Sequence, residues 1–300
     1  MKALYDVPAP AKLNLFLHVN GRRQDGYHLL QSVFMLVDWC DTLHFEIRHD
    51  GLLSREDLTV ALPADDLVLR AAKALKDYTG CAWGAHIGIE KRIPTQAGMG
   101  GGSSDAASCL LALNRIWKLN LPLATLAQLG LSLGADVPFF VRGRNAWVEG
   151  IGEKITPLEG PHALPSAQFL VVKPASGLDT AKIFSAQDLP RDTKTATMID
   201  FAAQSKFDFG RNDLQAVAER LCPEVTLALD WLNHLGLKGR MTGSGSAVFA
   251  PLGDVSGNWA ALDESPQGWQ VRVCSNLDIH PLAGWASCDN ECRLAEKTPV

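Results

Sequence analysis

The sequence lacks the segments that would place the protein in or across a membrane. No stretch of about 18 consecutive apolar residues occurs anywhere in the 300 residues, so no membrane-spanning helix is predicted. Residues 1–10 contain an aspartate and two prolines, and they lack the apolar segment of a signal peptide. We therefore expect a cytoplasmic protein with no membrane partner.

A concentrated positive charge is also missing. The formal net charge is −5, and the basic residues are scattered along the chain. Because a nucleic-acid-binding surface requires a dense basic patch, we expect no nucleic-acid partner. A phosphorylated small molecule needs only a few local cations, so it remains a suitable ligand.

Cysteine is too sparse and too irregularly spaced to indicate a disulfide framework. The seven cysteines are an odd number, and a chain of this length does not depend on disulfides to fold. We expect mostly reduced, buried thiols. Only Cys288 and Cys292 lie close together, and two thiols lack the other two ligands of a structural zinc site, so we expect no metal there.

The most informative segment is glycine-rich and spans residues 98–107, GMGGGSSDAA. It ends in Gly-Ser-Ser without the lysine of a Walker loop, and Ser103 stands where a dinucleotide fingerprint needs glycine. Its four glycines let the backbone approach a ligand, and the helix predicted after it adds free amides and a positive dipole end. The segment therefore predicts phosphate binding, and the alternative is a flexible surface loop. Ser103 and Ser104 are candidates to cap that helix, contact phosphate or coordinate a phosphate-bound magnesium.

Hydrophobic patterns predict an α+β architecture in two halves, because strands and helices do not alternate strictly. Strands are predicted over residues 12–19, 32–36, 41–47, 58–62, 85–89, 169–173, 247–250 and 269–273. Helices are predicted over 67–78 after a cap at Asp65 and Asp66, over 106–117 after a Ser103/Ser104 cap, and over 123–134, 213–221 and 224–235. A segment rich in proline and glycine, 157–165, predicts a boundary between domains 1–158 and 159–283, followed by a polar tail, 284–300.

Residues 94–107 resemble the central motif of the GHMP kinases, a family that includes galactokinase and the homoserine, mevalonate and phosphomevalonate kinases. The segment PAKLNL at 10–15 resembles the first motif of that family, and MTGSGSA at 241–247 resembles the third. The resemblance implies the two-domain GHMP kinase fold, with ATP held by the glycine-rich segment in an active-site cleft between the domains.

Four shorter matches narrow the resemblance within the family: AKLNL at 11–15, DGYH at 25–28, GADVPFF at 134–140 and RNDL at 211–214. They are similar to the branch that phosphorylates the 2-hydroxyl of 4-diphosphocytidyl-2-C-methyl-D-erythritol in non-mevalonate isoprenoid precursor synthesis. The cofactors implied are ATP and Mg²⁺, with no magnesium ligand assigned. Two alternatives stay open: another GHMP kinase with mevalonate, homoserine or a sugar as acceptor, or a nucleotide-binding module of this fold without turnover.

The resemblance implies a role for Asp136 as the general base, with Lys12 paired to it and Asn14 orienting the substrate. In the alternatives, Asp136 merely caps a turn before Pro138 and Lys12 lies at a solvated edge. Residues implied in ATP binding are Lys91, Pro94, Gly98, Met99, Gly100, Gly101, Gly102, Ser103 and Ser104, with the Leu67 region near the adenine.

The resemblance also implies a pocket for cytosine, with the base stacked between Tyr27 and Phe184 and contacted by His28. Other implied substrate contacts are Thr180, also a candidate helix cap, and Gly243 and Ser244 of the third motif. Without the family, Tyr27 would be a partly buried turn residue and Phe184 a core residue. Ser185 stands where some relatives carry a lysine, so one basic contact to the nucleotide is missing here.

Overall fold

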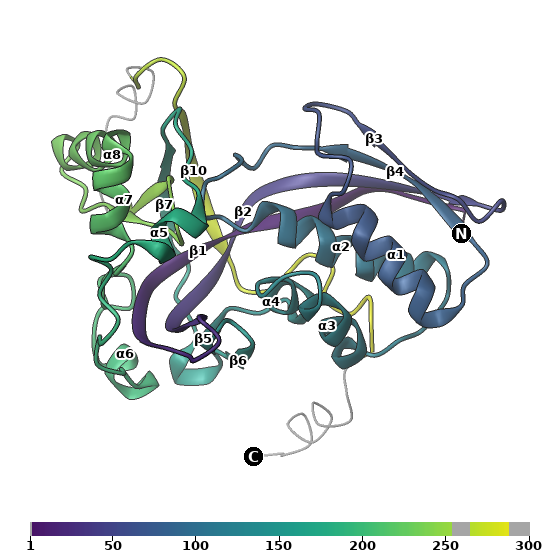
Figure 1. Ribbon diagram of the computed structural model, residues 1–300, viewed down its shortest axis with the longest axis horizontal. Coiled ribbons are helices and arrows are strands. Elements are labelled where there is room, and N and C mark those ends of the chain that lie inside the picture. The colour runs from purple at the N-terminus through teal and green to yellow at the C-terminus, as the bar shows by residue number, and fades with distance from the viewer. Residues whose placement is uncertain (1, 254–264, 288–300) are drawn as a thin grey trace.

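The computed structural model describes residues 2–253 and 265–287, and two long antiparallel strands run through it (Figure 1). Strand β1 spans Ala3–Arg22 and β2 spans His28–Arg48. The bend between them contains Asp25 and Gly26, as predicted. The strands predicted at 32–36 and 41–47 are one continuous strand, because pairing shifts register beside Asp38 and Trp39 and so interrupts the alternating pattern.

Ten strands form one connected sheet in the described ranges. The further strands are β3 (Leu53–Asp57), β4 (Gly84–Glu90), β5 (Ala146–Gly150), β6 (Lys154–Pro157), β7 (Gln168–Lys173), β8 (Arg240–Met241), β9 (Val248–Pro251) and β10 (Gln270–Leu277). The main order is β3-β4-β2-β10-β7-β9-β8, with β1 and β5 also paired to β2, and β6 paired to β5. Strand β10 therefore joins the two halves of the sheet through β2 and β7.

The strand predicted at 58–62 was wrong, since the strand of this region is β3, which pairs in parallel with β4. The Asp57 carboxylate accepts a hydrogen bond from the Leu62 amide at 2.9 Å and so closes residues 57–62 into a turn. Leu58 and Val60 are exposed within that turn. Their apolar side chains resemble those of a strand, which is why a strand was predicted there.

The helices lie in two groups. Helices α1 (Leu67–Thr79), α2 (Gly101–Ile116), α3 (Leu123–Leu131) and α4 (Val137–Arg142) pack together beside the first half of the sheet, and α5 (Thr180–Ser185), α6 (Met198–Ala203), α7 (Gln215–Leu221) and α8 (Pro223–His234) lie at the other end (Figure 1). A short 3₁₀ helix spans Gly160–His162. None of the helices in the described part of the chain is long and apolar enough to cross a bilayer.

Local signals predicted α1 well and α2 less well. Asp66 caps α1 by accepting a hydrogen bond from the Leu69 amide at 3.0 Å, and Gly80 ends the helix in the left-handed conformation. The predicted apolar stripe was wrong at Tyr78, which is exposed. The Ser103/Ser104 cap of α2 was also wrong, because the helix already begins at Gly101, after Gly100 turns the chain with a φ of 72°.

The segment around Asp136 differs from the single helix predicted over residues 123–134. Helix α3 ends at Leu131, and α4 begins at Val137 with a proline in its first turn. Proline suits that position because its fixed φ matches a helix and it has no amide hydrogen to leave unpaired. Asp136 therefore lies between two helices, immediately before α4.

The core is built from several clusters of buried side chains. One cluster packs α1–α4 against β1, β2 and β4, and another packs α5, α7 and α8 against β7 and β9. Strand β1 is buried on both faces through much of its length, so its alternation marks two buried surfaces. The domain limits at 158 and 283 remain predictions. Cys40, Cys81, Cys109, Cys222 and Cys274 are free thiols, whereas Cys288 and Cys292 lie outside the described residues.

Candidate active site

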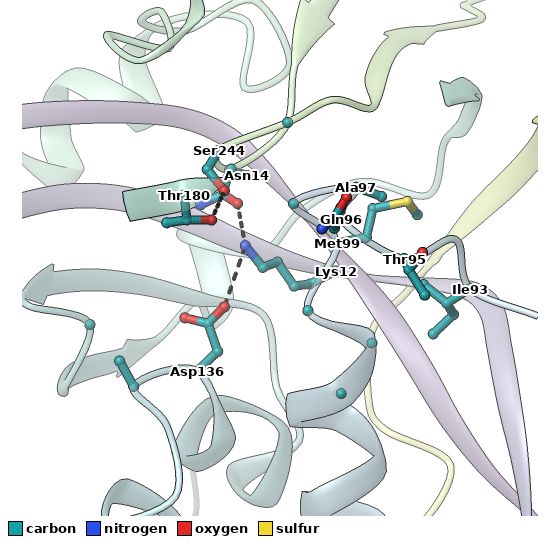
Figure 2. Close-up of a pocket in the computed structure, with 18 of the residues that line it drawn as sticks. Lys12, Asn14, Ile93, Thr95, Gln96, Ala97, Met99, Asp136, Thr180 and Ser244 are labelled. Atoms are coloured by element: carbon teal, nitrogen blue, oxygen red, sulfur yellow. Dashed lines mark hydrogen bonds and ion pairs between the residues drawn. The ribbon is translucent and has the colours of Figure 1, made fainter. Parts of the chain in front are cut away.

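A cavity of about 780 Å³ opens where the glycine-rich segment, β1, the start of α4 and the loop between β8 and β9 meet. Most of the residues predicted to contact ATP or substrate line it: Lys12, Asn14, Lys91, Pro94, Gly98, Met99, Gly100, Gly101, Gly102, Asp136, Thr180, Phe184, Gly243 and Ser244. Figure 2 labels six of them: Lys12, Asn14, Met99, Asp136, Thr180 and Ser244. Ser103 and Ser104 do not line it. The Ser104 hydroxyl is fully buried and donates to the Pro10 carbonyl at 2.7 Å.

The glycine-rich segment presents a row of free backbone amides. No acceptor in residues 2–253 or 265–287 takes up the amides of residues 98–103. Residues 101–103 form the first turn of α2, so the positive end of the helix dipole lies behind the same amides. Amides and dipole together form a site suited to an anion such as phosphate.

Close backbone packing holds this segment against the third motif. A Cβ on Gly98 would lie 2.3 Å from the Thr242 carbonyl oxygen, so only glycine fits there, and Gly98 also has a φ of 71°. The Lys12 amide donates to the Met99 carbonyl at 3.0 Å, and the Ser246 amide donates to the Gln96 carbonyl at 3.0 Å. The loop is therefore fixed by β1 on one side and by residues 242–246 on the other.

Lys12 and Asp136 face each other across the cavity. The Lys12 ammonium lies 3.6 Å from a carboxylate oxygen of Asp136, and it also donates to the Asn14 amide oxygen (Figure 2). Burial lowers the pKa of Lys12, and the Asp136 carboxylate opposes that shift by favouring the charged form. Asp136 keeps 30% of its side chain exposed, so it remains open to a ligand.

Asn14 links this pair to the rest of the site. Its side-chain amide donates to the Ser32 hydroxyl at 2.8 Å, and its backbone amide donates to the Thr242 hydroxyl at 2.9 Å. Nearby, Thr180 and Ser244 share a hydrogen bond of 2.6 Å between their hydroxyls. Thr180 does not cap α5, because the cap is Asp179, whose carboxylate accepts from the Ala181 amide.

Lys91 is held by two buried carboxylates at the other end of the cavity. Its ammonium pairs with Asp41 and, at 2.5 Å, with Asp105. Burial raises the pKa of Asp105 to about 8; Lys91 opposes this rise and Asp41 adds to it. Burial alone would lower the pKa of Lys91, but the two carboxylates raise it. One oxygen of Asp105 has no hydrogen-bond partner among the described residues.

A second cavity of about 560 Å³ adjoins the first and shares Thr180 and Phe184 with it. It brings Tyr27, His28 and Phe184 together, as the resemblance implied. Tyr27 is exposed, and the rings of His28 and Phe184 lie 5.1 Å apart at 32°. Burial lowers the pKa of His28, and the positive charges of Arg191 and Arg22 add to that shift, so all three effects favour the neutral ring.

Sequence reasoning missed Asp41 and Arg191. Asp41 accepts hydrogen bonds from the amides of Arg92 and Ile93, and Arg191 donates to the His28 ring. Both contacts join segments more than 50 residues apart, so no local pattern indicated them.

Free backbone amides suited to an anion therefore lie in the same cavity as a buried lysine–aspartate pair. Residues 66–144 match the family model described as GHMP kinases N terminal domain, and residues 199–256 match GHMP kinases C terminal. The chain belongs to the GHMP kinase family.

Two curated relatives of this chain carry the same enzyme name. The 4-diphosphocytidyl-2-C-methyl-D-erythritol kinase of Variovorax paradoxus (strain S110) is 64% identical over 303 residues, covering 96% of this chain and 100% of the relative. The enzyme of the same name from Albidiferax ferrireducens (strain ATCC BAA-621 / DSM 15236 / T118) is 65% identical over 290 residues, covering 96% and 98%.

Solved structures agree with this relationship. A crystal structure of 4-(cytidine 5'-diphospho)-2C-methyl-D-erythritol kinase is 33% identical with a TM-score of 0.73, covering 90% of this chain and 98% of that one. A mevalonate kinase structure has a TM-score of 0.68 at 16% identity, covering 92% and 99%, and at that identity it supports the fold alone.

Proposed function

We propose that the protein transfers the γ-phosphoryl group of ATP to the 2-hydroxyl of 4-diphosphocytidyl-2-C-methyl-D-erythritol. The observation that carries the proposal is the placement of the Lys12–Asp136 pair in the same cavity as the free amides of residues 98–103. Relatives at 61–65% identity over nearly the whole chain carry the same named activity. The enzyme would thereby act in isoprenoid precursor synthesis.

Each part of the site has a distinct task in this reaction. The amides of residues 98–103 bind the ATP phosphates and hold the terminal group toward Asp136. Asp136 accepts the proton of the attacking hydroxyl as the new oxygen–phosphorus bond forms, and the bond to the β-phosphate oxygen breaks to release ADP. The Lys12 ammonium stabilises the negative charge of the transferring group and holds the Asp136 carboxylate in place.

Magnesium is proposed to enter with the nucleotide. The described residues contain no group of three or more acidic, histidine or cysteine side chains placed to hold an ion. Mg²⁺ bound to a nucleotide takes most of its ligands from phosphates and water, so such a group is not required. The ion would supply charge neutralisation on the phosphates when bound.

The second cavity is proposed to bind the cytidine end of the acceptor. It is continuous with the catalytic cavity through Thr180 and Phe184, so one extended ligand can occupy both. Tyr27 and Phe184 supply aromatic faces for the base, and such stacking contributes about 1–3 kcal/mol per base in nucleic-acid complexes. Mevalonate, homoserine and galactose contain no base to stack in this cavity.

A coupled assay of ADP release tests the proposal directly. With Mg-ATP, we expect turnover of 4-diphosphocytidyl-2-C-methyl-D-erythritol and none of 2-C-methyl-D-erythritol 4-phosphate, mevalonate or homoserine. Phosphorus NMR of the product should show a new monophosphate ester on the acceptor. Turnover of mevalonate or homoserine alone would overturn the substrate assignment, and no turnover of any acceptor would favour a binding module.

A further inference from the structure

Arg191 connects the histidine of the second cavity to the segment that carries Phe184. Its Nε donates to the His28 Nε2 atom at 3.1 Å. The remainder of its guanidinium donates to the carbonyls of Ala186 at 2.7 Å, Leu189 at 2.9 Å and Phe184 at 3.4 Å. Three hydrogen bonds to backbone carbonyls leave the guanidinium little freedom, so the direction of its Nε–H group toward His28 is set by the fold.

This contact decides which nitrogen of His28 carries the proton. Arginine has only donors and stays charged, so the His28 Nε2 atom must be the acceptor. A neutral imidazole with an accepting Nε2 carries its proton on Nδ1. No acceptor in the described part of the chain takes up Nδ1, and His28 lines the second cavity. The ring therefore has one donor left for a ligand.

We propose that Arg191 is a positioning residue for base selection, which acts by holding His28 as a hydrogen-bond donor toward the pyrimidine ring. This inference rests on the proposed function. Cytosine has an acceptor at N3 between its amino group and O2, whereas uracil has a donor, N3–H, at the same position. A fixed Nδ1–H group is complementary to cytosine N3 and meets uracil N3–H donor to donor. Specificity of this kind arises because the mismatched ligand leaves buried polar groups without partners.

The proton position can be measured in the unmodified protein. Long-range ¹H–¹⁵N correlation spectra of protein labelled with ¹⁵N-histidine, assigned with His28→Gln, distinguish the two neutral tautomers. We expect the Nδ1–H form of His28 in wild type and a mixture of forms in Arg191→Met. A wild-type His28 protonated at Nε2 would overturn the inference, whether or not any variant folds.

Kinetics of Arg191→Met then separate positioning from general support of the fold. Loss of one well-placed hydrogen bond corresponds to about a tenfold change, so we expect KM for the cytidylated acceptor to rise about tenfold, with kcat and KM for ATP nearly unchanged. Discrimination against the uridine-linked analogue should fall by a similar factor. In a His28→Ala background, Arg191→Met should add no further rise.

A matched control contacts the same stretch of chain from helix α7. Arg220 forms an exposed ion pair with Asp188, which lies between Ala186 and Leu189 in the sequence. Arg220 does not touch His28. Arg220→Met should leave the preference for cytosine unchanged. If Arg191→Met keeps wild-type discrimination, or raises KM for ATP as much as KM for the acceptor, the inference fails. If wild type does not turn over the cytidylated acceptor, the proposed function fails, and the tautomer measurement still tests the Arg191–His28 contact.

Discussion

Substitution of Asp136 by asparagine removes the proposed proton acceptor while keeping the shape of the side chain. An amide cannot take the hydroxyl proton, and general bases typically contribute about 10²–10⁴-fold to rate, so we expect kcat to fall at least about 100-fold. KM for ATP should change little, because the amides of residues 98–103 are untouched. The effect is thus expected on the chemical step rather than on nucleotide binding.

The same substitution should weaken the fold only moderately. At the observed separation of 3.6 Å the Lys12–Asp136 attraction is about 4–5 kcal/mol at an effective dielectric constant of about 20, and about 1 kcal/mol in water. Asp136 is 30% exposed, and desolvation of Lys12 offsets much of the attraction. We expect a loss of about 1–3 kcal/mol in the free energy of unfolding, which leaves the protein folded.

The assay compares steady-state ADP release and urea unfolding for wild type, Asp136→Asn and a matched control. Asp77→Asn serves as that control, because Asp77 pairs with Lys73 at 2.8 Å on the exposed face of α1, away from the cavity. The control should keep wild-type turnover. Turnover of Asp136→Asn within a few-fold of wild type would refute the assignment of Asp136 as the base. A 100-fold loss of turnover in Asp77→Asn as well would show that the effect does not depend on the place of Asp136 in the cavity.

Two further predictions concern backbone packing and pH. Gly98→Ala should raise KM for ATP at least about tenfold, because its Cβ would lie 2.3 Å from the Thr242 oxygen. Gly80→Ala is the control, because Gly80 has a similar φ but lies in open space. It should lower the free energy of unfolding by only about 1–2 kcal/mol and leave KM for ATP unchanged. Equal effects on KM would contradict the packing argument. Burial lowers the pKa of His280 from 6.5 to about 4. As pH falls from 6.5 toward 4, the unfolded chain therefore binds a proton at this residue before the folded protein does. The free energy of unfolding should fall by up to about 3 kcal/mol over this pH range. His280→Asn, which keeps an acceptor for the Leu282 amide, should flatten this dependence in urea unfolding at pH 7 and pH 5, and an unchanged dependence would exclude His280 as its source.

Elements governed by neighbours in the sequence were predictable. Helix α1 follows from an aspartate cap and a terminating glycine, both of which act within one turn. Strand β4 follows from alternation and leads into the glycine-rich segment as expected. The α+β class and the GHMP fold were also confirmed. They could be predicted because three motifs in the family order are spread over most of the chain.

Features that depend on distant contacts were not predictable. Residues 38 and 39 lie at an irregularity within one long strand, which only the register with β1 makes visible. Residues 58–62 look like a strand, yet one carboxylate at Asp57 closes them into a turn. Among the site residues, the Lys12–Asp136 pair was expected from family resemblance, whereas the Asp41–Lys91–Asp105 group and the Arg191–His28 contact depend on folding in three dimensions.

The position of β10 has a consequence for the order in which the polypeptide can acquire its structure. Strand β7 is bordered by β9 and β10, which are both made later in synthesis. While a ribosome is still adding residues 248–277, β7 has unpaired edges that could associate with other chains. We expect nascent chains that stop before residue 270 to require chaperone protection, even though the helices of the N-terminal half have already left the exit tunnel.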